Sequence, residues 1–283
     1  MRHGVKKVTV WDKLKESFRT DRKIWIIGAA CAAAVILAVI LISVTGGGKG
    51  KLSGGARWEF DRSGILTISG EGSTGDMDLA GKAPAWAKYA SRITTVIVEE
   101  GVTGIGKSAF DGDFLPEGQR YAMTQVILPE SLTEIGDCAF YNCVYLEEVA
   151  FEEKSSLTRI GNSAFYGCTS LQEIRLPDGV SEIGEGAFED CAAMTFAGIP
   201  GTVKSLYSAF AGCTNLSQVI LGEGLEDIGY GTFSYCEKLT RVDLPMSLQR
   251  IGEYAFWYSG LTELTVPAAV TELGEALLES ALR

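Results

Sequence analysis

Histidine is nearly absent from this sequence of 283 residues, and its single copy, His3, lies in a basic segment at the N-terminus. A Ser/His/Asp triad, a Cys/His dyad and His-containing metal sites all need histidine, so the rest of the chain cannot build them. Cysteines at C-x-x-C spacing are also missing, which removes another common metal site. We therefore expect no catalytic residues, no metal ligands and no cofactor.

Positive charge is scarce beyond the first 24 residues. That segment holds eight Lys/Arg and three Asp/Glu, which leaves 17 Lys/Arg and 33 Asp/Glu in the rest of a chain whose net charge is −11. Such an acidic body repels phosphate backbones, and no basic patch with interleaved aromatics compensates. We expect no nucleic-acid partner.

One long apolar run, IWIIGAACAAAVILAVILISV, covers residues 24–44 without a charged residue. A helix of this length rises about 30 Å, the thickness of the hydrocarbon core of a bilayer. A cleaved signal peptide is the alternative, but its apolar stretch is typically only about 7 to 15 residues, and no clear small-x-small cleavage site follows the run. The run is therefore predicted to be a transmembrane helix that anchors the protein.

Basic residues precede this run, and the positive-inside rule then orients the chain in the plasma membrane. We expect a cytoplasmic basic head over 1–23, a single-pass span over 24–44 and an exported body at the cell surface. The next stretch, TGGGKGKLSGG at 45–55, is predicted to be a flexible Gly-rich linker.

A pattern of about 23 residues recurs eight times from residue 93 onward. The units begin at Ile93, Met123, Leu146, Leu171, Met194, Leu216, Leu239 and Leu261. A catalytic motif occurs once in a domain, whereas a structural unit recurs, and a sustained period of this length indicates a solenoid.

One unit, LQEIRLPDGVSEIGEGAFEDCAA, shows what each position is for. Ile174 belongs to a short strand, and Pro177 ends that strand because it cannot donate to a ladder. Gly184 is expected to free the backbone for a tight bend, after which a helical turn buries Phe188. Cys191 then supplies a small buried side chain where the next coil passes.

The same positions in the other units give the predicted core of the repeat. Its members are Phe110, Phe140, Phe165, Phe188, Phe210, Phe233, Phe256, Cys143, Cys168, Cys191, Cys213 and Cys236. Stacked cysteine side chains point the same way, so buried reduced thiols are favoured over disulfides. Whether any of them pair is left open.

The units resemble the BspA-like leucine-rich repeat family, whose pattern is approximately L-x-x-V-x-L-P-x-x-V-x-x-I-G-x-x-A-F-x-x-C. The pattern stands here in ILPESLTEIGDCAFYNC, IRLPDGVSEIGEGAFEDC and VDLPMSLQRIGEYAFWYS. The resemblance implies a β-rich, right-handed solenoid of short parallel strands and helical turns over 93–283. Members of this family are often bacterial cell-surface proteins, and some are adhesins.

Residues 56–92 are predicted to cap the first coil. They read as a β-hairpin, with Trp58 and Leu66 on opposite arms, followed by a turn or short helix that places Trp86 against the coil. At the other end, Leu278 replaces the repeated Phe and Ala281 replaces the Cys.

Outward strand positions give a candidate ligand face. Its members are Ile97, Gln125, Ile127, Glu148, Glu173, Arg175, Phe196, Gln218, Ile220, Arg241 and Asp243. The apolar members Ile97, Ile127, Phe196 and Ile220 are expected to be presented to solvent, and an apolar stripe rimmed by polar groups suggests a docking surface. Ordinary β-propensity explains the same pattern, and the two interpretations stay open.

The favoured function is a non-enzymatic, membrane-anchored cell-surface protein whose solenoid mediates protein–protein interaction or adhesion. Its partner is a macromolecule, a protein or a glycan, and the sequence does not set the oligomeric state. The main alternative is an envelope scaffold or sensor that links a cytoplasmic or membrane partner to the cell wall. A wall hydrolase that uses a carboxylate pair is a third, less favoured reading.

Overall fold

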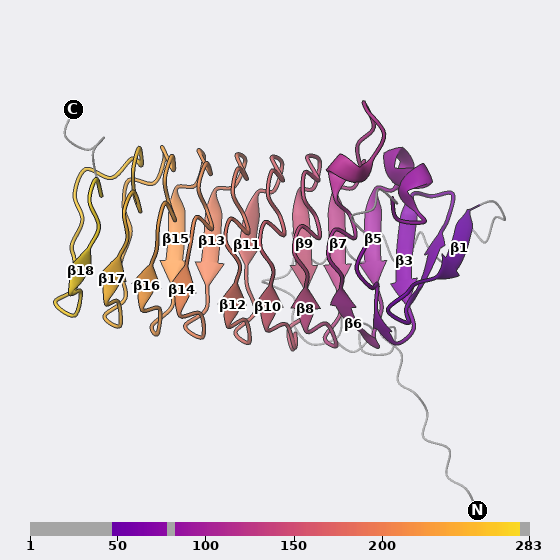
Figure 1. The fold of residues 1–283 in the computed structure, drawn as a ribbon, viewed down its shortest axis with the longest axis horizontal. Helices are drawn as coiled ribbons and strands as arrows, with labels where there is room; N and C mark the ends of the chain where they lie inside the picture. The colour runs from indigo at the N-terminus through magenta and orange to yellow at the C-terminus, as the bar shows by residue number, and fades with distance from the viewer. Residues whose placement is uncertain (1–46, 78–82, 278–283) are drawn as a thin grey trace, which may run out of the picture. The chain divides into compact units, whose positions relative to one another are not determined.

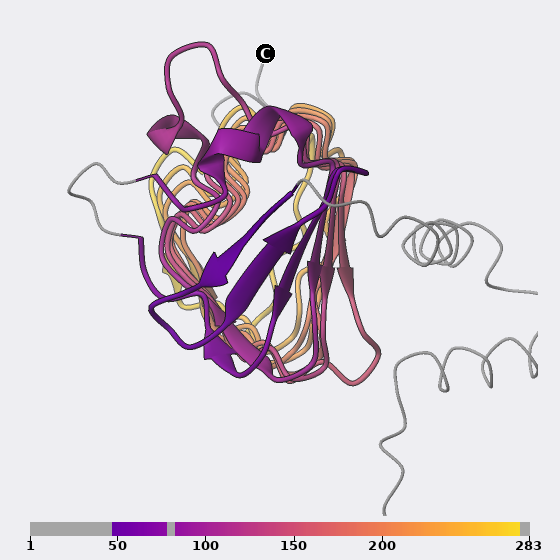
Figure 2. The same ribbon diagram turned by 90° about the vertical axis from the view of Figure 1, so that its right-hand side faces the viewer.

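The computed structural model describes residues 47–77 and 83–277, which form a row of coils stacked one behind the next (Figure 1). Viewed along the stack, successive coils superimpose (Figure 2). Most coils add one or two short parallel strands to the stack, and each has a turn segment around the repeated Phe. The predicted β-rich repeat fold with parallel strands is confirmed.

The first row of strands carries the predicted ligand face, and it is split into two sheets. The larger sheet contains β1 (Gly48–Lys51), β2 (Arg57–Phe60), β3 (Ile65–Ser69), β5 (Thr95–Val98), β7 (Gln125–Leu128) and β9 (Glu148–Phe151), and the smaller contains β11 (Glu173–Arg175), β13 (Phe196–Ile199) and β15 (Gln218–Leu221). The split between β9 and β11 follows the lengthened third unit, whose extra residues EEKSS come directly after β9. Within the described residues, units seven and eight add no strand to this row.

A second row of shorter strands runs along the stack and is split one coil later. One sheet contains β4 (Gly72–Ser73), β6 (Val102–Ile105), β8 (Glu134–Ile135), β10 (Arg159–Ile160) and β12 (Glu182–Ile183), and the other contains β14 (Ser205–Leu206), β16 (Asp227–Ile228), β17 (Arg250–Ile251) and β18 (Glu272–Leu273). The split falls at the fifth unit, where Tyr207 stands in place of the usual glycine.

The glycine after each second-row strand is required by the approach of the preceding coil. A Cβ added at Gly184 would lie 2.3 Å from the backbone nitrogen of Asn162. Gly184 donates its N–H to the carbonyl of Ile160 at 2.8 Å and does not have a positive φ. The expectation that Gly184 frees the backbone for a bend is therefore wrong. The fifth unit has Tyr207 in place of this glycine and one residue fewer between Leu206 and Phe210 than the fourth unit has between Ile183 and Phe188, and the second row splits at this unit.

The segment around each repeated Phe contains left-handed residues and is not a helical turn. The residue two positions before the Phe, or before Leu278 in the last unit, has a positive φ in every unit: Ser108, Cys138, Ser163, Gly186, Ser208, Gly231, Tyr254 and Ala276. Most units also have a positive φ two positions after the Phe, as at Asp190 with 59°. Left-handed residues interrupt a right-handed helix, so the predicted helical turns are wrong.

These turns hydrogen-bond to the next coil through their backbones. Phe188 N–H donates to the carbonyl of Ala209 at 2.9 Å, and Asp190 N–H donates to that of Ala211 at 2.8 Å. Equivalent bonds connect each unit to the next from Ser108 in the first unit to Tyr254 in the seventh. We call this side of the solenoid the turn face. Its hydrogen bonds continue across both coils at which the strand rows split.

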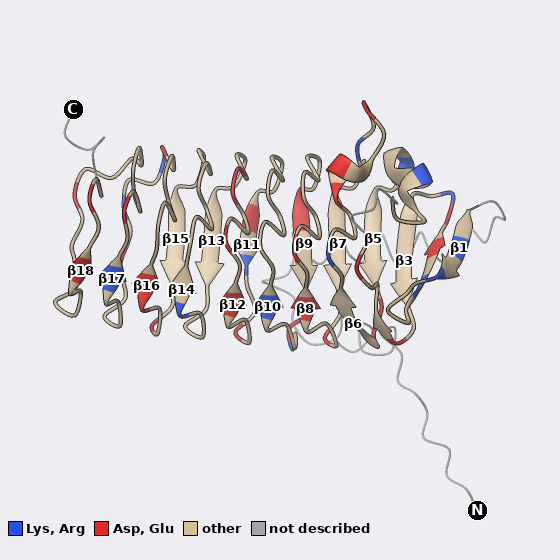
Figure 3. Ribbon diagram, in the orientation of Figure 1, with Lys and Arg blue, Asp and Glu red and all other residues tan. Residues whose placement is uncertain are grey.

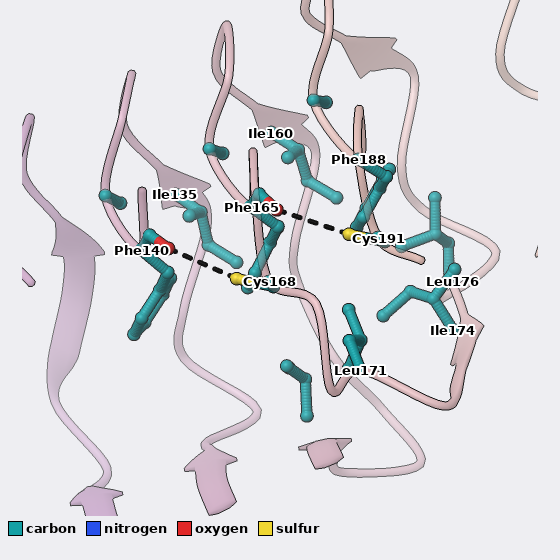
Figure 4. Close-up of a cluster of buried hydrophobic side chains, with 14 of the residues drawn as sticks. Ile135, Phe140, Ile160, Phe165, Cys168, Leu171, Ile174, Leu176, Phe188 and Cys191 are labelled. Carbon is teal, nitrogen blue, oxygen red and sulfur yellow. Dashed lines mark hydrogen bonds between the residues drawn. The ribbon is translucent and has the colours of Figure 1, made fainter. Parts of the chain in front are cut away.

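The repeated phenylalanines form one stack inside the solenoid. From Phe110 to Phe256 they are fully buried, and successive ring centroids lie 5.1 to 5.7 Å apart with nearly parallel planes. Each thiol donates to a carbonyl of the preceding coil, as Cys168 Sγ does to Phe140 O at 3.2 Å (Figure 4). The five repeat cysteines are buried and free in this structure.

The predicted N-terminal cap contains a hairpin and a short helix. β2 and β3 form an antiparallel hairpin with Trp58 opposite Ile68, and β3 joins the first row by pairing in parallel with β5. Trp86 directly precedes a short 3₁₀ helix, η1 (Ala87–Arg92), and its ring stacks on that of Phe110 at 5.1 Å. The aromatic side chains of the cap therefore continue the phenylalanine stack.

The predicted linker is in part a strand of the cap. β1 pairs antiparallel with β2, and Gly50 lies opposite Trp58. A Cβ at Gly50 would lie 2.7 Å from Trp58 Nε1, so glycine here lets the backbone lie against the indole ring. The prediction of a flexible linker over 45–55 is wrong for Gly48–Lys51 because these glycines serve close packing.

Several predictions lie outside the described residues: the basic head 1–23, the span 24–44, Leu278 and Ala281. Within 47–77 and 83–277, no helix is both long and apolar enough to cross a membrane. The extra residues of the first unit, 111–122, include a second 3₁₀ helix, η2 (Gly112–Phe114), and form a loop that projects from the stack (Figure 2).

Candidate interaction surfaces

We call the outward side of the first strand row the sheet face. Of its predicted apolar members, Ile220 on β15 is 53% exposed, whereas Ile97 and Ile127 are half-buried. Phe196 is only 8% exposed, and the Arg175 guanidinium lies 3.9 Å from its ring centroid. The expectation that Phe196 faces solvent is wrong because the cation of the preceding coil covers its ring.

The polar members of the sheet face pair with one another along and between strands. Gln125 Nε2 donates to Glu148 Oε2 at 2.9 Å from the neighbouring strand. Arg175 Nη2 lies 3.5 Å from Glu173 Oε2, and Arg241 Nη2 lies 2.9 Å from Asp243 Oδ1. Gln218 on β15 is exposed. These pairs form the polar surroundings expected for the apolar members.

The split between β9 and β11 leaves a shallow hollow on the sheet face. It has a volume of about 180 Å³ and is lined by Glu147, Glu148, Val149, Phe151, Glu173 and Arg175. A second open depression of about 430 Å³ lies beside it, lined by Glu147, Thr169, Ser170, Gln172, Ala193 and Thr195. Glu147 lines both depressions. The hollow lies where the third unit is lengthened. The extra residues are visible in the sequence, but the loss of pairing between β9 and β11 is visible only in the structure.

Three stacked carboxylates form the group with metal-ligand spacing among the described residues. Glu100, Glu130 and Glu152 come from consecutive coils, and one oxygen of each lies within 4.8 Å of the others. Glu130 N–H donates to Glu100 Oε1 at 2.9 Å, so one carboxylate already accepts a backbone bond. Glu100 is exposed, and carboxylates in such a position are ordinarily solvated.

The pKa values of the buried thiols make them poor nucleophiles. Burial raises the pKa of Cys143 and Cys191 well above the ordinary value, and burial likewise raises that of Cys168. A thiol reacts as the thiolate, so these groups stay protonated and inert at neutral pH. On the turn face, a hydrogen bond with Asp190 raises the pKa of Tyr166 to about 12.

Arginines beside the second strand row connect three coils at a time. Arg159 on β10 lies 2.5 Å from Glu134 Oε1 on β8 and 3.0 Å from Glu182 Oε1 on β12. Arg250 on β17 donates to Asp227 at 2.7 Å and to the Tyr207 hydroxyl at 2.7 Å. Figure 3 shows both arginines as single blue strands between red ones.

An aromatic cluster on the turn face was missed by the sequence reasoning. We call it the aromatic cluster, and its members are Tyr230, Tyr235, Tyr254, Trp257 and Tyr258. The rings of Tyr235 and Tyr258 are stacked with centroids 5.4 Å apart, and Trp257 lies edge-on to both. The segments YGTFSYC and EYAFWYS contain the signal, because their aromatics occupy outward positions on both sides of the buried Phe.

The family model for the BspA type leucine-rich repeat region matches this chain in six copies, over residues 85–208 and 198–282. The matched residues make up well over half of the chain. No protein with a curated description matches it.

Several solved structures of bacterial leucine-rich repeat proteins are similar to this chain. One from Bacteroides ovatus has 23% identity and a TM-score of 0.51, covering 79% of this chain and 60% of its own. A leucine-rich repeat protein from T. pallidum has 22% identity and a TM-score of 0.51, covering 75% and 86%. A leucine rich cell surface protein from Faecalibacterium prausnitzii has 25% identity and a TM-score of 0.50, covering 82% and 52%. This chain thus spans only about half to two thirds of the first and third of these proteins.

Proposed function

Because the chain belongs to the BspA-type leucine-rich repeat family, we propose that it is a membrane-anchored cell-surface protein whose solenoid binds another macromolecule. A role for leucine-rich repeat proteins in protein–protein interaction supports a protein as the partner. The similar chain from Faecalibacterium prausnitzii is described as a cell surface protein, which supports an exported solenoid. Adhesion is the specific form of binding that we favour.

One observation carries the proposal. The residues that recur in every unit are buried in the core, and the side chains that differ from unit to unit point outward. The stacked phenylalanines and the five repeat thiols are buried, and burial raises the pKa of the Cys143 thiol well above its ordinary value. The sheet face in contrast carries Ile220 exposed between ion pairs. A surface of this kind binds by complementarity over several coils and needs no cofactor.

The position of the solenoid is tested by protease treatment of intact cells that produce the full chain. The basic head and the apolar run 24–44 predict that residues 93–283 lie outside and are removed, while the head is protected. Disruption of the cells serves as the control, since it should expose the head as well. Retention of the solenoid in intact cells would contradict the proposed orientation.

The binding face is tested by placing a photo-crosslinking amino acid at Ile220 and, separately, at Met246. Both side chains are exposed, at 53% and 68%, but only Ile220 lies on a strand of the sheet face. We expect irradiated cells to give one discrete adduct from the Ile220 position and none from the Met246 position. Mass spectrometry of the adduct separates a protein from a glycan partner.

The scaffold alternative makes a different prediction in the same experiment. A solenoid that only spaces or senses at the cell wall gives no adduct at Ile220, while partners of the basic head are still recovered. Substitution of Ile127 and Ile220 by Asp should then leave function intact, whereas it should abolish binding if the sheet face is the docking surface.

A further inference from the structure

The aromatic cluster lies on the turn face, away from the sheet face, and none of its members belongs to the repeat core. Tyr230, Tyr235 and Tyr258 are 57%, 42% and 47% exposed, and Tyr254 and Trp257 are half-buried. The five rings come from two consecutive coils and contact one another in an unbroken chain. Exposed tyrosine and tryptophan grouped in this way are the residue types that dominate the energy of protein interfaces.

Three of these tyrosines have a backbone conformation that their side chains disfavour. Tyr235, Tyr254 and Tyr258 have φ values of 58°, 57° and 53°. At the same positions other coils have smaller residues, such as Ser163, Gly186 and Asn142, and glycine and asparagine are the ones that tolerate this region best. A bulky residue with a positive φ is strained, so stability does not explain the choice of tyrosine. Retention of three such residues in one patch points to a function of the rings.

The turn face carries an excess of negative charge, which favours a positively charged partner. The described segments around the aligned Phe positions carry eight carboxylates, Asp111, Asp113, Asp137, Glu185, Glu189, Asp190, Glu253 and Glu275, against one cation, Lys107. Glu253 directly precedes Tyr254, and Glu237 follows Tyr235 by two positions; both are exposed. The segments 229–237 and 252–260, which hold all five rings, contain no Lys or Arg, and the exposed Lys238 that follows Glu237 donates to Asn215 Oδ1 of the preceding coil.

We propose that the aromatic cluster binds a basic segment of a partner protein, with Lys or Arg side chains over the Tyr and Trp rings and beside Glu253 and Glu237. A cation over an aromatic face is attracted by the ring quadrupole, and neighbouring carboxylates strengthen the attraction. The same contact already exists inside the molecule, where Arg175 covers Phe196 with 3.9 Å between guanidinium carbon and ring centroid. The cluster offers several such rings with no cation of its own.

The test uses the full chain and a fluorescein-labelled octa-arginine peptide as the probe, with octa-glutamate as the negative comparison. We expect Trp257→Ala and Tyr235→Gly to weaken octa-arginine binding about tenfold or more. Tyr235→Gly suits the left-handed backbone, so its loss of binding cannot be ascribed to unfolding. Trp257→Phe keeps an aromatic face and should retain most of the affinity.

Two matched controls separate the cluster from general attraction to an acidic protein. Tyr145→Ala removes a tyrosine that is 54% exposed outside the cluster and should bind octa-arginine like the wild type. Glu185→Gln removes an exposed carboxylate of the turn face three coils from Glu253 and should weaken binding less than Glu253→Gln. Equal effects of Trp257→Ala and Tyr145→Ala, or of the two Gln variants, would overturn the proposal.

A glycan is the other class of ligand that stacks on exposed aromatic rings. Binding of cellohexaose that is lost in Trp257→Ala, together with no binding of octa-arginine, would overturn the proposal in favour of a glycan. Ile127→Asp should weaken crosslinking from position 220 of the sheet face and leave octa-arginine binding unchanged. Failure of this inference is therefore distinguishable from failure of the proposed function.

Discussion

The turn face and the strand rows respond differently to irregular units. The strand rows split where the third unit is lengthened and where Tyr207 replaces glycine. The turn face keeps its backbone hydrogen bonds across the same coils, as between Phe165 and Ala187 at 2.8 Å and between Phe188 and Ala209 at 2.9 Å. The positions from two residues before the Phe to two residues after it keep the same spacing in these units, so their register is preserved when other parts of the coil change.

This difference shows which part of the repeat holds the coils together. Stability of a solenoid depends on contacts between neighbouring units. Those contacts run without interruption along the turn face and along the phenylalanine stack beneath it, whereas both strand rows are split. The strand rows are free to vary in length and sequence, and it is on such rows that an exposed binding surface can change. The following substitutions test this comparison in order of expected effect.

The largest effect is expected for Phe188→Ala, which removes a fully buried ring from the middle of the stack. The neighbouring rings lie 5.3 and 5.4 Å away and cannot close the space, so we expect a loss of about 3–5 kcal/mol in unfolding free energy. Urea denaturation measures it. Tyr230→Ala, at an exposed ring, is the control, and a loss of less than about 1 kcal/mol for Phe188→Ala would contradict the ranking.

A smaller loss, about 1–3 kcal/mol, is expected for Gly184→Ala. Its added Cβ would meet the backbone of Asn162 at 2.3 Å, and backbone cannot move aside as a flexible side chain can. Gly179→Ala is the matched control, since the nearest atom to its Cβ is Leu157 O at 3.1 Å. If both variants unfold at the same urea concentration, close approach of the coils is not the reason for the glycine.

Stability should also fall at alkaline pH because of the buried thiols. Burial raises the pKa of Cys168 and Cys213 above the ordinary thiol value, so the folded chain keeps protons that the unfolded chain loses. The stabilising contribution is complete below about pH 8.5, the unfolded pKa, and decreases as pH rises above it, by up to about 1.4 kcal/mol per thiol for each pH unit.

The measurement compares urea midpoints at neutral and alkaline pH for the wild type and for Cys168→Ala with Cys213→Ala. The double variant is less stable at neutral pH but should lose less stability on going to alkaline pH. Identical pH slopes for the two proteins would show that these thiols do not titrate differently in the folded chain.

The smallest effect is expected for Arg159→Ala on the second strand row. Its three carboxylate partners, Glu134, Asp137 and Glu182, are about one third to two thirds exposed, so solvent screens the pairs. We expect a loss of at most about 1 kcal/mol that shrinks at high salt. Lys204→Ala removes one exposed pair with Glu226 and should lower the unfolding free energy by less than Arg159→Ala does. A larger loss for Lys204→Ala would contradict the greater contribution expected of Arg159.

Much of the fold could be predicted from the repeat. The period, the burial of Phe188 and Cys191 and the contact of Trp86 with the first coil agree with what the sequence predicted. The role of Gly184 was predicted wrongly, because a glycine required by close packing of coils looks the same in a sequence as a glycine required by a bend. The contact of the Arg175 guanidinium with the Phe196 ring could not be predicted from the sequence either, since the two residues are on different strands.

The sequence by itself determined the number of units, the residues that fill their interior and the acidic charge of the body, because these depend only on residue type and spacing. Only the tertiary structure decided where the strand rows split and which outward side chains meet. Tyr235 and Tyr258 are 23 residues apart in the chain, and their rings come within 5.4 Å because one coil lies on the next. Contacts between coils depend on how neighbouring backbones fit together, and no single unit contains that information.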